Sequence, residues 1–487
     1  MNNCVITIDD LKKKVTSYNK KDWDIVEKAY FYAEKHHKKQ KRASGEPYIM
    51  HPLNVAYILS SMHADSDTLC AALLHDVVED TKVSLSELKN DFNETIAYLV
   101  DGVTKLTKMR FSSKDELMAI NIRRIIVSIR EDARIIIIKL VDRLHNMRTL
   151  EYKKLERQQQ IALETLEIYV PMAYYIGAYK IKDELEDLSF RYLKPDTYRE
   201  LEKKINIIHR ENKKMLNKMV LNVKKALKEL NIKCHLEMRF KDTYSVHKKM
   251  ITKSTIDNIH DLLGIKVIVN DIKDCYLALM VIHSLYPPVS YKFKDYIVKP
   301  KTNMYKALHT TVFGSNNRLV QFQIRTKEME RIAIYGLTSY WFKNKGFAHQ
   351  KIQKDLEDNF QFFKSIKELD SSIADNIEFV NQVKTEIFGT NIYVRTTQGE
   401  VVELPVNSTP IDFAYKIHTD IGNSMIAAIV NDEVVPFDYR LKSNDRVRII
   451  TDNKAFVPKE DWLDKVVTTH AKREILEYLK KYNEENK

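Results

Sequence analysis

The stretch LLHDVVED, residues 73–80, decides how the first part of this chain folds. Helical spacing places Glu79 four residues after His75 and three residues after Asp76, so one face of a predicted helix carries all three side chains. A lone His-Asp pair is common on helix surfaces as a capped or salt-bridged pair. Here three carboxylates, the third being Asp80, adjoin the apolar run AALLHDVV, and burying such a cluster without a cation is costly. The stretch therefore predicts a buried helix that contributes to a metal site.

Two distant segments carry side chains of the same kind. YIMHP presents His51 directly before a proline, and IIIIKLVDRLHNM presents Asp142, with His145 and Asn146 one helical turn later. Imidazole nitrogens mixed with carboxylate oxygens favour Mn, Fe or Zn, and a mixed site of this kind usually activates water. Four of six side chains are enough to hold a divalent metal, and two carboxylates are left for chemistry; the six are His51, His75, Asp76, Glu79, Asp80 and Asp142.

Length and composition indicate a large, mainly helical protein. A chain of 487 residues is too long for one ordinary core and predicts about three domains. Ten glycines and eleven prolines are few for this length, so helix should dominate. The four cysteines have no C-x-x-C spacing, which argues against a zinc ribbon or a disulfide framework and favours a reducing cytoplasm. The sequence shows no signal-peptide core and no apolar run of bilayer length, so we expect a cytoplasmic protein without a membrane partner.

The net charge of +12 is concentrated in one segment. Residues 203–256 hold fifteen Lys/Arg and four Asp/Glu, a local charge of +11. Such a segment is either a solvated lysine-rich helix or a surface for polyphosphate or RNA, and its charge alone does not distinguish the two.

The hydrophobic pattern divides the chain into helical, mixed and β-rich parts. From Trp23 to about Leu193 one amphipathic helix follows another without a convincing strand. After Lys194-Pro195-Asp196 a helical stripe leads into a mixed part that ends near Gly346. Its predicted elements are strands at residues 265–269 and 319–324 and a helix at residues 275–285.

A polar helical linker precedes a small β-rich module. The module shows a hairpin at IYVRTTQGEVVEL, a helix that starts at Thr409-Pro410 and ends between His418 and Gly422, and short strands around residues 431–432 and 445–450. The predicted parts are residues 1–195 (all-α), 196–350 (α+β), 351–385 (helical linker), 386–452 (β-grasp module) and 453–487 (helical tail).

Ordered motifs cover nearly the whole chain. The first part contains RASGEPYIMHP, HDVVEDT, VDGVTKL, KLVDRLHNMRTL and IKDELEDLSFRYL, the second YSVHKKM, DLLGIKVIV, FKDYIVKPK, ALHTTV and QIRTKEM, and the last ELPVNSTPIDFAYKIHTDIGN. In this order they resemble the signatures of the RelA/SpoT homologues, which make and destroy the alarmone (p)ppGpp. The resemblance implies a multidomain protein with an all-α HD-domain hydrolase, an α+β nucleotidyltransferase-like synthetase domain and a small β-grasp TGS domain.

By this resemblance the first domain hydrolyses the 3′-diphosphate of (p)ppGpp to GDP or GTP and pyrophosphate. The family's pattern implies that Mn²⁺ binds His51, His75, Asp76 and Asp142, that Glu79 and Asp80 handle the attacking water, and that the nucleotide is held by Arg42, Ser44, Asn146 and Thr149. A metal lowers the pKa of bound water from about 16 towards neutrality. Arg42 and Arg143 offer permanent positive charge to the diphosphates, with a structural ion pair as the alternative for Arg143.

The middle domain resembles the family's synthetase, which moves pyrophosphate from ATP to the 3′-hydroxyl of GDP or GTP and needs Mg²⁺ when it is active. The residues that match the active form are Arg239, Lys241, Ser245, Lys249, Asp261, Lys294, Tyr305, His309 and Arg325. The family's E-I-Q-I-R-T strand reads QFQIRT here, so its acidic metal partner is Gln321, which has no charge and cannot act as a general base. We therefore predict a crippled synthetase, with neutral drift in a still-active site as the alternative.

Further departures from the synthetase pattern point the same way. Met238 and Met304 replace glycines, and Lys266 replaces an arginine. Lys306 replaces a glutamine, and Glu330 and Tyr340 replace histidines. Glycine beside a nucleotide permits close backbone approach, which a methionine side chain would obstruct.

The last module resembles a TGS domain, which in long family members contacts the acceptor end of uncharged tRNA on the ribosome. His418 matches its contact histidine, and a role in capping the helix is the alternative. The chain stops about 35 residues after the end of this module, so we expect no zinc-finger or ACT-type region. This expectation argues against stable ribosome sensing.

These features predict a cytoplasmic, Mn-dependent (p)ppGpp hydrolase of the stringent response with a degenerate synthetase-like domain. One rival is a bifunctional enzyme that also makes (p)ppGpp from ATP and GDP or GTP. A second is a non-catalytic tRNA or ribosome sensor that uses the basic helix and the TGS domain. A third is an HD hydrolase for a different nucleotide.

Overall fold

Two compact units make up the fold: Met1–Lys108 with Ser128–Gln361, and Met109–Val127 with Phe362–Lys487. The computed structural model describes residues 6–16, 18–104, 123, 132–253, 256, 259, 261–298, 300, 305–314, 317–336, 369–371, 373–387, 391–452 and 458–485. The predictions for Met304, Tyr340, Gly346 and the first half of the linker fall outside the described residues.

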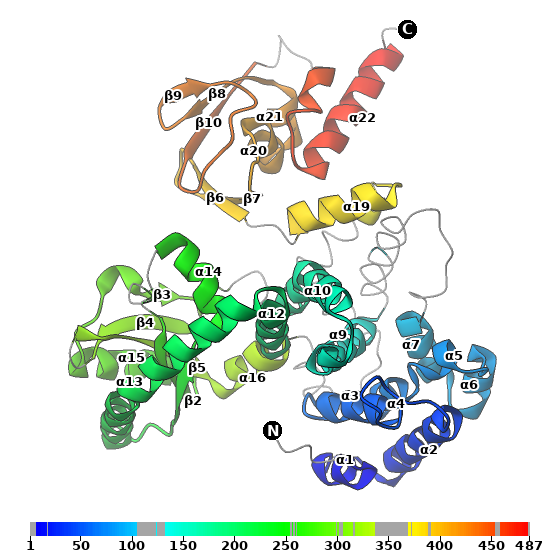
Figure 1. The fold of residues 1–487 in the computed structure, drawn as a ribbon. Coiled ribbons are helices and arrows are strands. Elements are labelled where there is room, and N and C mark those ends of the chain that lie inside the picture. Colours follow the sequence, from blue (N-terminus) through cyan, green and yellow to red (C-terminus); the bar gives the residue numbers. More distant parts are fainter. Residues whose placement is uncertain are drawn as a thin grey trace. The chain divides into compact units, whose positions relative to one another are not determined.

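The first unit begins with a bundle of helices, blue to cyan in Figure 1. Its helices are α1 (Ile8–Lys14), α2 (Lys20–His37), α3 (Met50–Ser60), α4 (Ser66–Leu74), α5 (Val77–Asp80), α6 (Leu85–Asp91), α7 (Glu94–Thr104), α9 (Ala133–Arg148), α10 (Leu155–Glu164), α11 (Val170–Tyr175) and α12 (Tyr179–Leu193), with a 3₁₀ turn at Leu150–Tyr152 and a π-helix at Thr165–Tyr169. Described residues up to 193 form no strand, which confirms the all-α prediction for this part. None of the described helices is long and apolar enough to cross a membrane.

The helix predicted through residues 73–80 is interrupted, so the prediction of one continuous helix face is wrong. Helix α4 ends just before His75 and α5 begins just after Asp76, which leaves both residues in the turn between them. The Nδ1 atom of His75 lies 2.8 Å from the Ala72 carbonyl oxygen, and Thr104 Oγ1 donates a 3.2 Å hydrogen bond to the carbonyl of His75. Because side chains bond to these carbonyls, the backbone polar groups stay satisfied although the helix stops.

A five-stranded mixed sheet follows in the same unit, in the order β1-β2-β5-β4-β3. Its elements are α13 (Pro195–Glu229), β1 (His235–Phe240), α14 (Thr243–Lys253), β2 (Leu263–Val269), α15 (Ile272–Leu285), β3 (Lys294–Asp295), β4 (Leu308–Phe313), β5 (Leu319–Thr326) and α16 (Lys327–Tyr335), with a 3₁₀ turn at Ser290–Lys292. Strands β2 and β5 are parallel, and the other neighbours are antiparallel. The strands predicted at residues 265–269 and 319–324 and the helix at 275–285 are confirmed.

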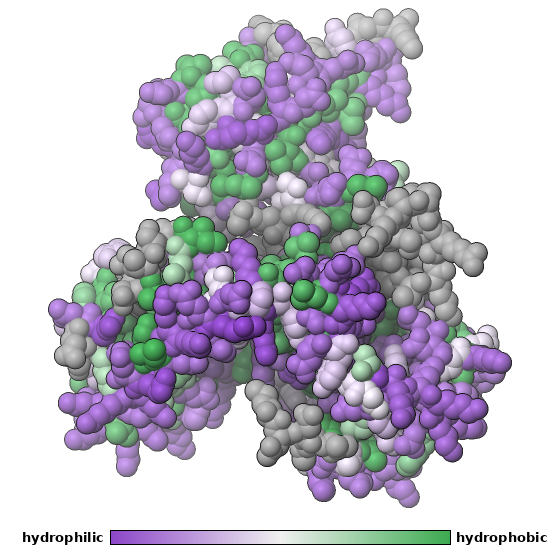
Figure 2. All heavy atoms as spheres, in the orientation of Figure 1, coloured by the Kyte–Doolittle hydropathy of each residue, from purple (hydrophilic) through white to green (hydrophobic). Residues whose placement is uncertain are grey.

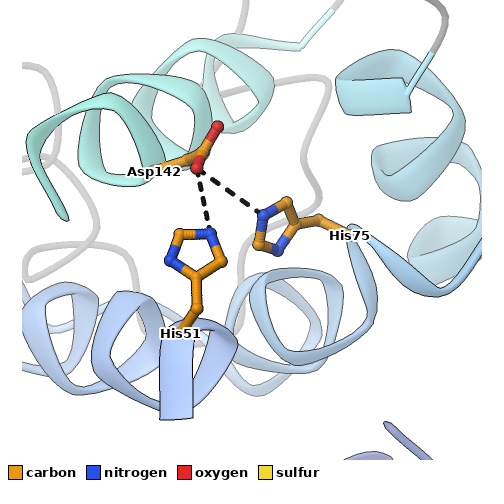
Figure 3. A group of neighbouring side chains, drawn as sticks. All are labelled: His51, His75 and Asp142. Atoms are coloured by element: carbon orange, nitrogen blue, oxygen red, sulfur yellow. Dashed lines mark ion pairs between the residues drawn. The ribbon is translucent and has the colours of Figure 1, made fainter. Parts of the chain in front are cut away.

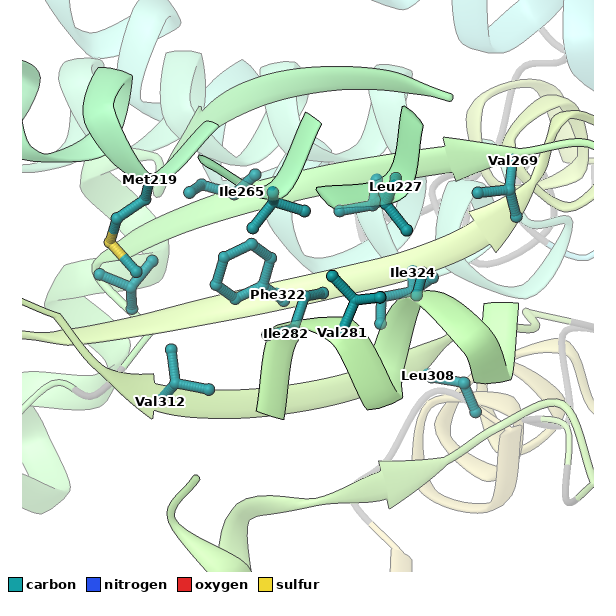
Figure 4. Close-up of a cluster of buried hydrophobic side chains, with 14 of the residues drawn as sticks. Met219, Leu227, Ile265, Val269, Val281, Ile282, Leu308, Val312, Phe322 and Ile324 are labelled. Carbon is teal, nitrogen blue, oxygen red and sulfur yellow. The ribbon is translucent and has the colours of Figure 1, made fainter. Parts of the chain in front are cut away.

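Alternation along the strands gives this sheet an apolar face and a polar face. Figure 4 shows Ile265 of β2 and Phe322 of β5 packed against Met219 of α13 and Ile282 of α15. Successive strand residues point to opposite faces, so Gln321 and Gln323 of β5 lie on the side away from this core. The chemistry-bearing residues of the strands are therefore gathered on the polar face.

The second unit contains a smaller mixed sheet in the order β7-β6-β10-β8-β9. Its elements are α19 (Asn376–Gln382), a π-helix at Val383–Ile387, β6 (Asn391–Thr396), β7 (Val401–Pro405), α20 (Pro410–Ile417), α21 (Thr419–Asn423), β8 (Met425–Val430), β9 (Glu433–Val435), β10 (Arg446–Thr451), a 3₁₀ turn at Glu460–Trp462 and α22 (Thr469–Glu485). The predicted hairpin and the helix start at Thr409-Pro410 are confirmed, and Trp462 and Ile475 share a core with α20.

Gly422 does not end the helix that starts at Pro410, contrary to the prediction. Helix α20 stops at Ile417, and Gly422 lies inside the next helix, α21. A Cβ atom on Gly422 would lie 2.5 Å from the Tyr415 ring, so glycine is needed there for close packing and not for a chain reversal.

Candidate active site

Three buried side chains from separate elements of the helical bundle converge in Figure 3. His51 lies in the first turn of α3, His75 in the turn after α4, and Asp142 within α9. One possible ligand atom from each lies within 4.8 Å of the others. His51 Nε2 is 3.1 Å and His75 Nε2 is 3.8 Å from Asp142 Oδ1. Helix packing thus joins residues that are far apart in the sequence.

The Nδ1 atoms of His51 and His75 have hydrogen-bond partners outside the cluster, so the Nε2 atoms of both rings face the other candidate ligands. His75 Nδ1 faces the Ala72 carbonyl, which accepts only from N–H, so the neutral ring keeps its lone pair on Nε2. That Nε2 atom is buried and has no hydrogen-bond partner among the described residues. His51 Nδ1 lies 2.8 Å from Nδ1 of His145, whose pKa burial lowers to about 3, so His145 is neutral and can accept. Both rings are oriented as metal ligands.

The carboxylates make the cluster strongly attractive to a cation. Asp76 Oδ1 lies 3.2 Å from His75 Nε2, and Asp76 Oδ2 lies 3.6 Å from His51 Nε2. Burial lowers the pKa of His75, but the charges of Asp76 and Asp142 outweigh it and raise the pKa to about 9. Burial also opposes ionisation of Asp142, yet Lys139, 3.2 Å away, and the histidines hold its pKa well below the ordinary value. This donor set, with its orphaned nitrogen, fits a divalent metal.

Tyr48, which the sequence reasoning missed, ties the ligand group to the proposed catalytic acids. Its hydroxyl lies 2.9 Å from Asp76 Oδ2 and 2.8 Å from Asp80 Oδ2, so its single proton can be donated to either carboxylate. Burial and the charge of Asp76 raise the pKa of Tyr48, so the phenol keeps the proton that it donates. Glu79 is half-buried and Asp80 is exposed. Tyr48 precedes His51 by three residues, a spacing that could have drawn attention to it.

Replacing Tyr48 with phenylalanine is expected to lower both metal affinity and hydrolytic activity by about 10-fold or more, because a group that orients a ligand carboxylate is lost. Titration of the purified protein with Mn²⁺, followed by a hydrolysis assay, measures both effects. Tyr57→Phe, on the same helix α3, is the matched control. A Tyr48→Phe protein with wild-type metal affinity and activity would show that the hydroxyl orients nothing.

The predicted nucleotide residues lie beside the metal cluster. Arg42 donates hydrogen bonds from Nη2 to Asn146 Oδ1 at 2.9 Å and to Thr149 Oγ1 at 3.2 Å. Asn146 in turn donates to Asp142 Oδ1 at 2.6 Å. Ser44 instead donates to a neighbouring glutamate in its own loop. Three of the four predicted residues therefore form one chain of bonds that leads to Asp142, a candidate metal ligand.

Arg143 forms a structural ion pair, the alternative to a diphosphate contact that the sequence left open. Its guanidinium pairs with Glu164 at 3.1 Å and lies over the Tyr169 ring, 4.1 Å from its centroid. The side chain is therefore engaged with α10 and the π-helix, as expected of a structural ion-pair partner.

A second site lies on the polar face of the larger sheet. All the synthetase-like residues predicted from the sequence line one open cavity of about 950 Å³; they are Arg239, Lys241, Ser245, Lys249, Asp261, Lys294, Tyr305, His309, Gln321 and Arg325. The lining comprises nine Lys/Arg and three Asp/Glu side chains, so the cavity is strongly cationic. Such a lining suits a polyanionic ligand.

Asp261, the acid of this cavity that matches the family's active form, is already paired with two lysines. Asp261 Oδ2 accepts from Lys241 at 2.6 Å and from Lys249 at 2.5 Å. Burial and the charge of Lys249 lower the pKa of Lys241 to about 8, despite the attraction of Asp261. Gln321 accepts a 3.2 Å hydrogen bond from Gln323. At the two positions where the family pattern implies a metal-binding pair of acids, the cavity therefore presents a carboxylate paired with lysines and an amide.

Two of the departures from the family pattern pair with each other. Lys266 Nζ lies 2.6 Å from Glu330 Oε1, and Arg325 Nε lies 3.1 Å from Glu330 Oε2. The Lys266 and Glu330 replacements therefore form an internal ion-pair network within the cavity wall.

The expected obstruction of the cavity by Met238 is wrong. Met238 packs against the apolar core of the sheet, whereas its neighbour Arg239 lines the cavity. Alternation along β1 places the two side chains on opposite faces, so the methionine side chain does not line the cavity. Lys306 is half-buried and is not among the cavity-lining residues.

His418 caps helix α21, which is the alternative to a tRNA contact that the sequence left open. Its Nδ1 accepts a 3.2 Å hydrogen bond from the backbone N–H of Asp420 at the start of α21. The side chain is 65% exposed, so the cap does not prevent an outside contact. The tRNA contact stays a prediction.

A buried histidine–aspartate centre in a helical bundle, followed by a mixed sheet with a cationic cavity and a small β-rich module, defines a multidomain HD and nucleotidyltransferase-like protein. Family models match in this order: the HD domain at residues 29–178, the region found in RelA/SpoT proteins at residues 238–346, and the TGS domain at residues 392–451. The chain belongs to the RelA/SpoT family, with an HD domain, a synthetase domain and a TGS domain.

Curated relatives cover nearly all of this chain. The guanosine-3′,5′-bis(diphosphate) 3′-pyrophosphohydrolase of Aquifex aeolicus (strain VF5) is 39% identical over 99% of the chain and 68% of its own length. The bifunctional (p)ppGpp synthase/hydrolase SpoT of Escherichia coli (strain K12) is 40% identical over 93% of the chain and 64% of its own length. The GTP pyrophosphokinase of Myxococcus xanthus is 41% identical over 95% of the chain and 61% of its own length. The chain thus spans about two thirds of the length of these relatives.

Proposed function

We propose that this chain is a Mn²⁺-dependent hydrolase that converts (p)ppGpp to GDP or GTP and pyrophosphate in the stringent response. The convergence of His51, His75 and Asp142, with Asp76 beside them, supports this most, because the orphaned His75 Nε2 and the carboxylate oxygens that it faces form a donor set that a shared cation would satisfy. The mixed nitrogen and oxygen donors suit Mn²⁺. The name of the Aquifex relative supports the same reaction.

The residues around the ligands have distinct tasks in this proposal. A metal bound to His51, His75, Asp76 and Asp142 would supply Lewis acidity and a water of lowered pKa. Glu79 and Asp80 handle the attacking water, one of them taking its proton, and Tyr48 holds Asp80 in place through its 2.8 Å hydrogen bond. Arg42, steadied by Asn146 and Thr149, binds the diphosphate.

We further propose that the synthetase-like site is catalytically impaired. Gln321 cannot ionise, and Asp261 is bound to two lysines. At these two positions the site therefore offers no uncompensated carboxylate to bind Mg²⁺ or to act as a general base for the 3′-hydroxyl.

Hydrolysis and synthesis measured side by side test both proposals. We expect the wild type with Mn²⁺ to hydrolyse (p)ppGpp, and with ATP, GDP and Mg²⁺ to synthesise it at least about 10²-fold more slowly than an enzyme with its general base intact. Asp76→Ala should abolish hydrolysis, whereas Asp261→Ala should leave it unchanged. Gln321→Glu should restore little synthesis, because Asp261 stays paired with its lysines.

Robust synthesis by the wild type would instead establish the bifunctional enzyme. One observation favours that candidate: every matching residue of the active form lines a single cavity of about 950 Å³. The E. coli relative is named as bifunctional. Loss of hydrolysis in Asp261→Ala would show cross-talk between the two sites.

Failure to hydrolyse (p)ppGpp with Mn²⁺ would leave two rivals. Turnover of another substrate, such as dGTP, in a competition panel would indicate an HD hydrolase for a different nucleotide. No turnover at all would favour a non-catalytic sensor of uncharged tRNA or the ribosome, for which the exposed His418 of the TGS domain is the proposed contact.

A further inference from the structure

The outer face of α13 is a continuous cationic surface. Between residues 203 and 228 this helix carries nine Lys/Arg and one acidic residue, Glu211. All nine are exposed; they are Lys203, Lys204, Arg210, Lys213, Lys214, Lys218, Lys224, Lys225 and Lys228. Hydrophilic residues predominate over α13 in Figure 2. At 1.5 Å per residue the surface is about 38 Å long.

The helix geometry aligns these charges away from the protein core. Lys214, Lys218 and Lys225 are separated by four and seven residues, which places them on one face. The opposite face buries Leu216 and Val223 against the sheet. The cations are therefore not needed for packing, and their mutual repulsion costs stability unless an anion binds.

A groove with one aromatic side lies on the flank of the same surface. It has a volume of about 470 Å³ and is lined by Asn206, His209, Arg210 and Lys213 of α13 and by Phe240 of β1. The ring centroids of His209 and Phe240 are 4.0 Å apart. Burial lowers the pKa of His209, so its ring is neutral at physiological pH. Arg210 and Lys213 belong both to the groove and to the cationic surface.

We propose that the outer face of α13 and this groove bind single-stranded nucleic acid. A row of lysines that follows the phosphates, beside aromatic rings on which a base can stack, is the combination that binds single strands without sequence preference. An acidic protein would satisfy the charges but not the aromatic groove. This surface is separate from the metal cluster and from the cationic cavity, since Arg210, Lys213 and His209 line neither.

Fluorescence anisotropy with a labelled uridine oligonucleotide of about 20 residues tests the proposal, using the full chain and varied salt. We expect micromolar binding at low salt. The triple variant Lys214→Glu, Lys218→Glu, Lys225→Glu should bind at least about 10-fold more weakly, and the slope of log K against log salt should fall by about 2, near 0.7 per lost contact. The matched control Lys20→Glu, Lys21→Glu, Lys35→Glu on α2 changes the net charge equally and should bind within about threefold of wild type.

Two further variants separate the contributions. His209→Ala should weaken binding by about 10-fold with an unchanged salt slope, because stacking is lost and charge is not. His418→Ala should bind as wild type, which distinguishes this surface from any tRNA contact of the TGS domain. A deoxythymidine oligonucleotide of equal length shows whether the 2′-hydroxyl contributes. Hydrolytic activity and thermal melting confirm that each variant is folded.

Two results would overturn the proposal. One is the absence of oligonucleotide binding at low salt; binding to vesicles that contain anionic lipid, lost in the α13 variant, would then identify a lipid surface as the partner. The other is equal weakening by the α13 and α2 triple variants, which would show only an effect of net charge.

Discussion

Asp142→Asn is expected to lower the rate of (p)ppGpp hydrolysis by about 10³-fold or more, which corresponds to about 4 kcal/mol of activation free energy. Asp142 Oδ1 lies 3.1 and 3.8 Å from the Nε2 atoms of His51 and His75, at the centre of the candidate ligand set. Asparagine keeps the shape of the side chain and removes the charge that attracts the cation. The effect should therefore appear first as lost metal, measured by elemental analysis of the purified protein.

Metal removal provides the comparison for this variant. Wild-type protein treated with a chelator should lose hydrolysis to the same extent and regain it with Mn²⁺, whereas Asp142→Asn should not recover at the same Mn²⁺ concentration. Asp24→Asn, on the exposed side of α2, is the matched control and should behave as wild type. Full activity of Asp142→Asn with stoichiometric metal would remove Asp142 from the ligand set.

Glu79→Gln is expected to lower kcat by about 10²- to 10⁴-fold without loss of metal, because the amide cannot accept a proton from the attacking water. Glu79 is half-buried in α5, directly before the carboxylate that Tyr48 holds. Since the metal stays, KM should change little. This combination distinguishes a proton acceptor from a ligand, for which activity and metal are lost together.

The pH dependence separates Glu79 from a merely structural carboxylate. If Glu79 is the base, the acidic limb of the wild-type rate profile should be absent in Glu79→Gln. Glu34→Gln, on the exposed face of α2, should keep both the rate and the profile. Retained metal with an unchanged profile and rate would assign the proton transfer to Asp80 instead.

Motif order and hydrophobic period were sufficient to predict much of the architecture. The all-helical first part, β2, β5 and α15, and the hairpin β6–β7 all lie where the pattern indicated. These elements are long or strongly periodic, so local sequence specifies them. The ligand types were also visible, because histidine and aspartate beside buried apolar runs are unusual without a cation.

The sequence did not predict where a helix is interrupted or which way individual side chains point. The turn at His75 and Asp76 depends on Thr104, which bonds to the His75 carbonyl from another helix. Gly422 lies inside a helix because the Tyr415 ring packs against it. Met238 has its side chain in the core and not in the cavity because of the register of β1. In each case a tertiary neighbour decides what the local pattern leaves open.

The sequence by itself determined which residue types are present: the candidate ligand residues, the amide at Gln321 in place of an acid, and the excess of lysine between residues 203 and 228. Only the tertiary structure decided how these residues act. It brought His51 and Asp142 together, paired Asp261 with two lysines, and turned the lysines of α13 outward beside an aromatic groove. The physical reason is that a side chain's type is written in the chain, whereas its charge state and its partners are set by distances that only packing creates.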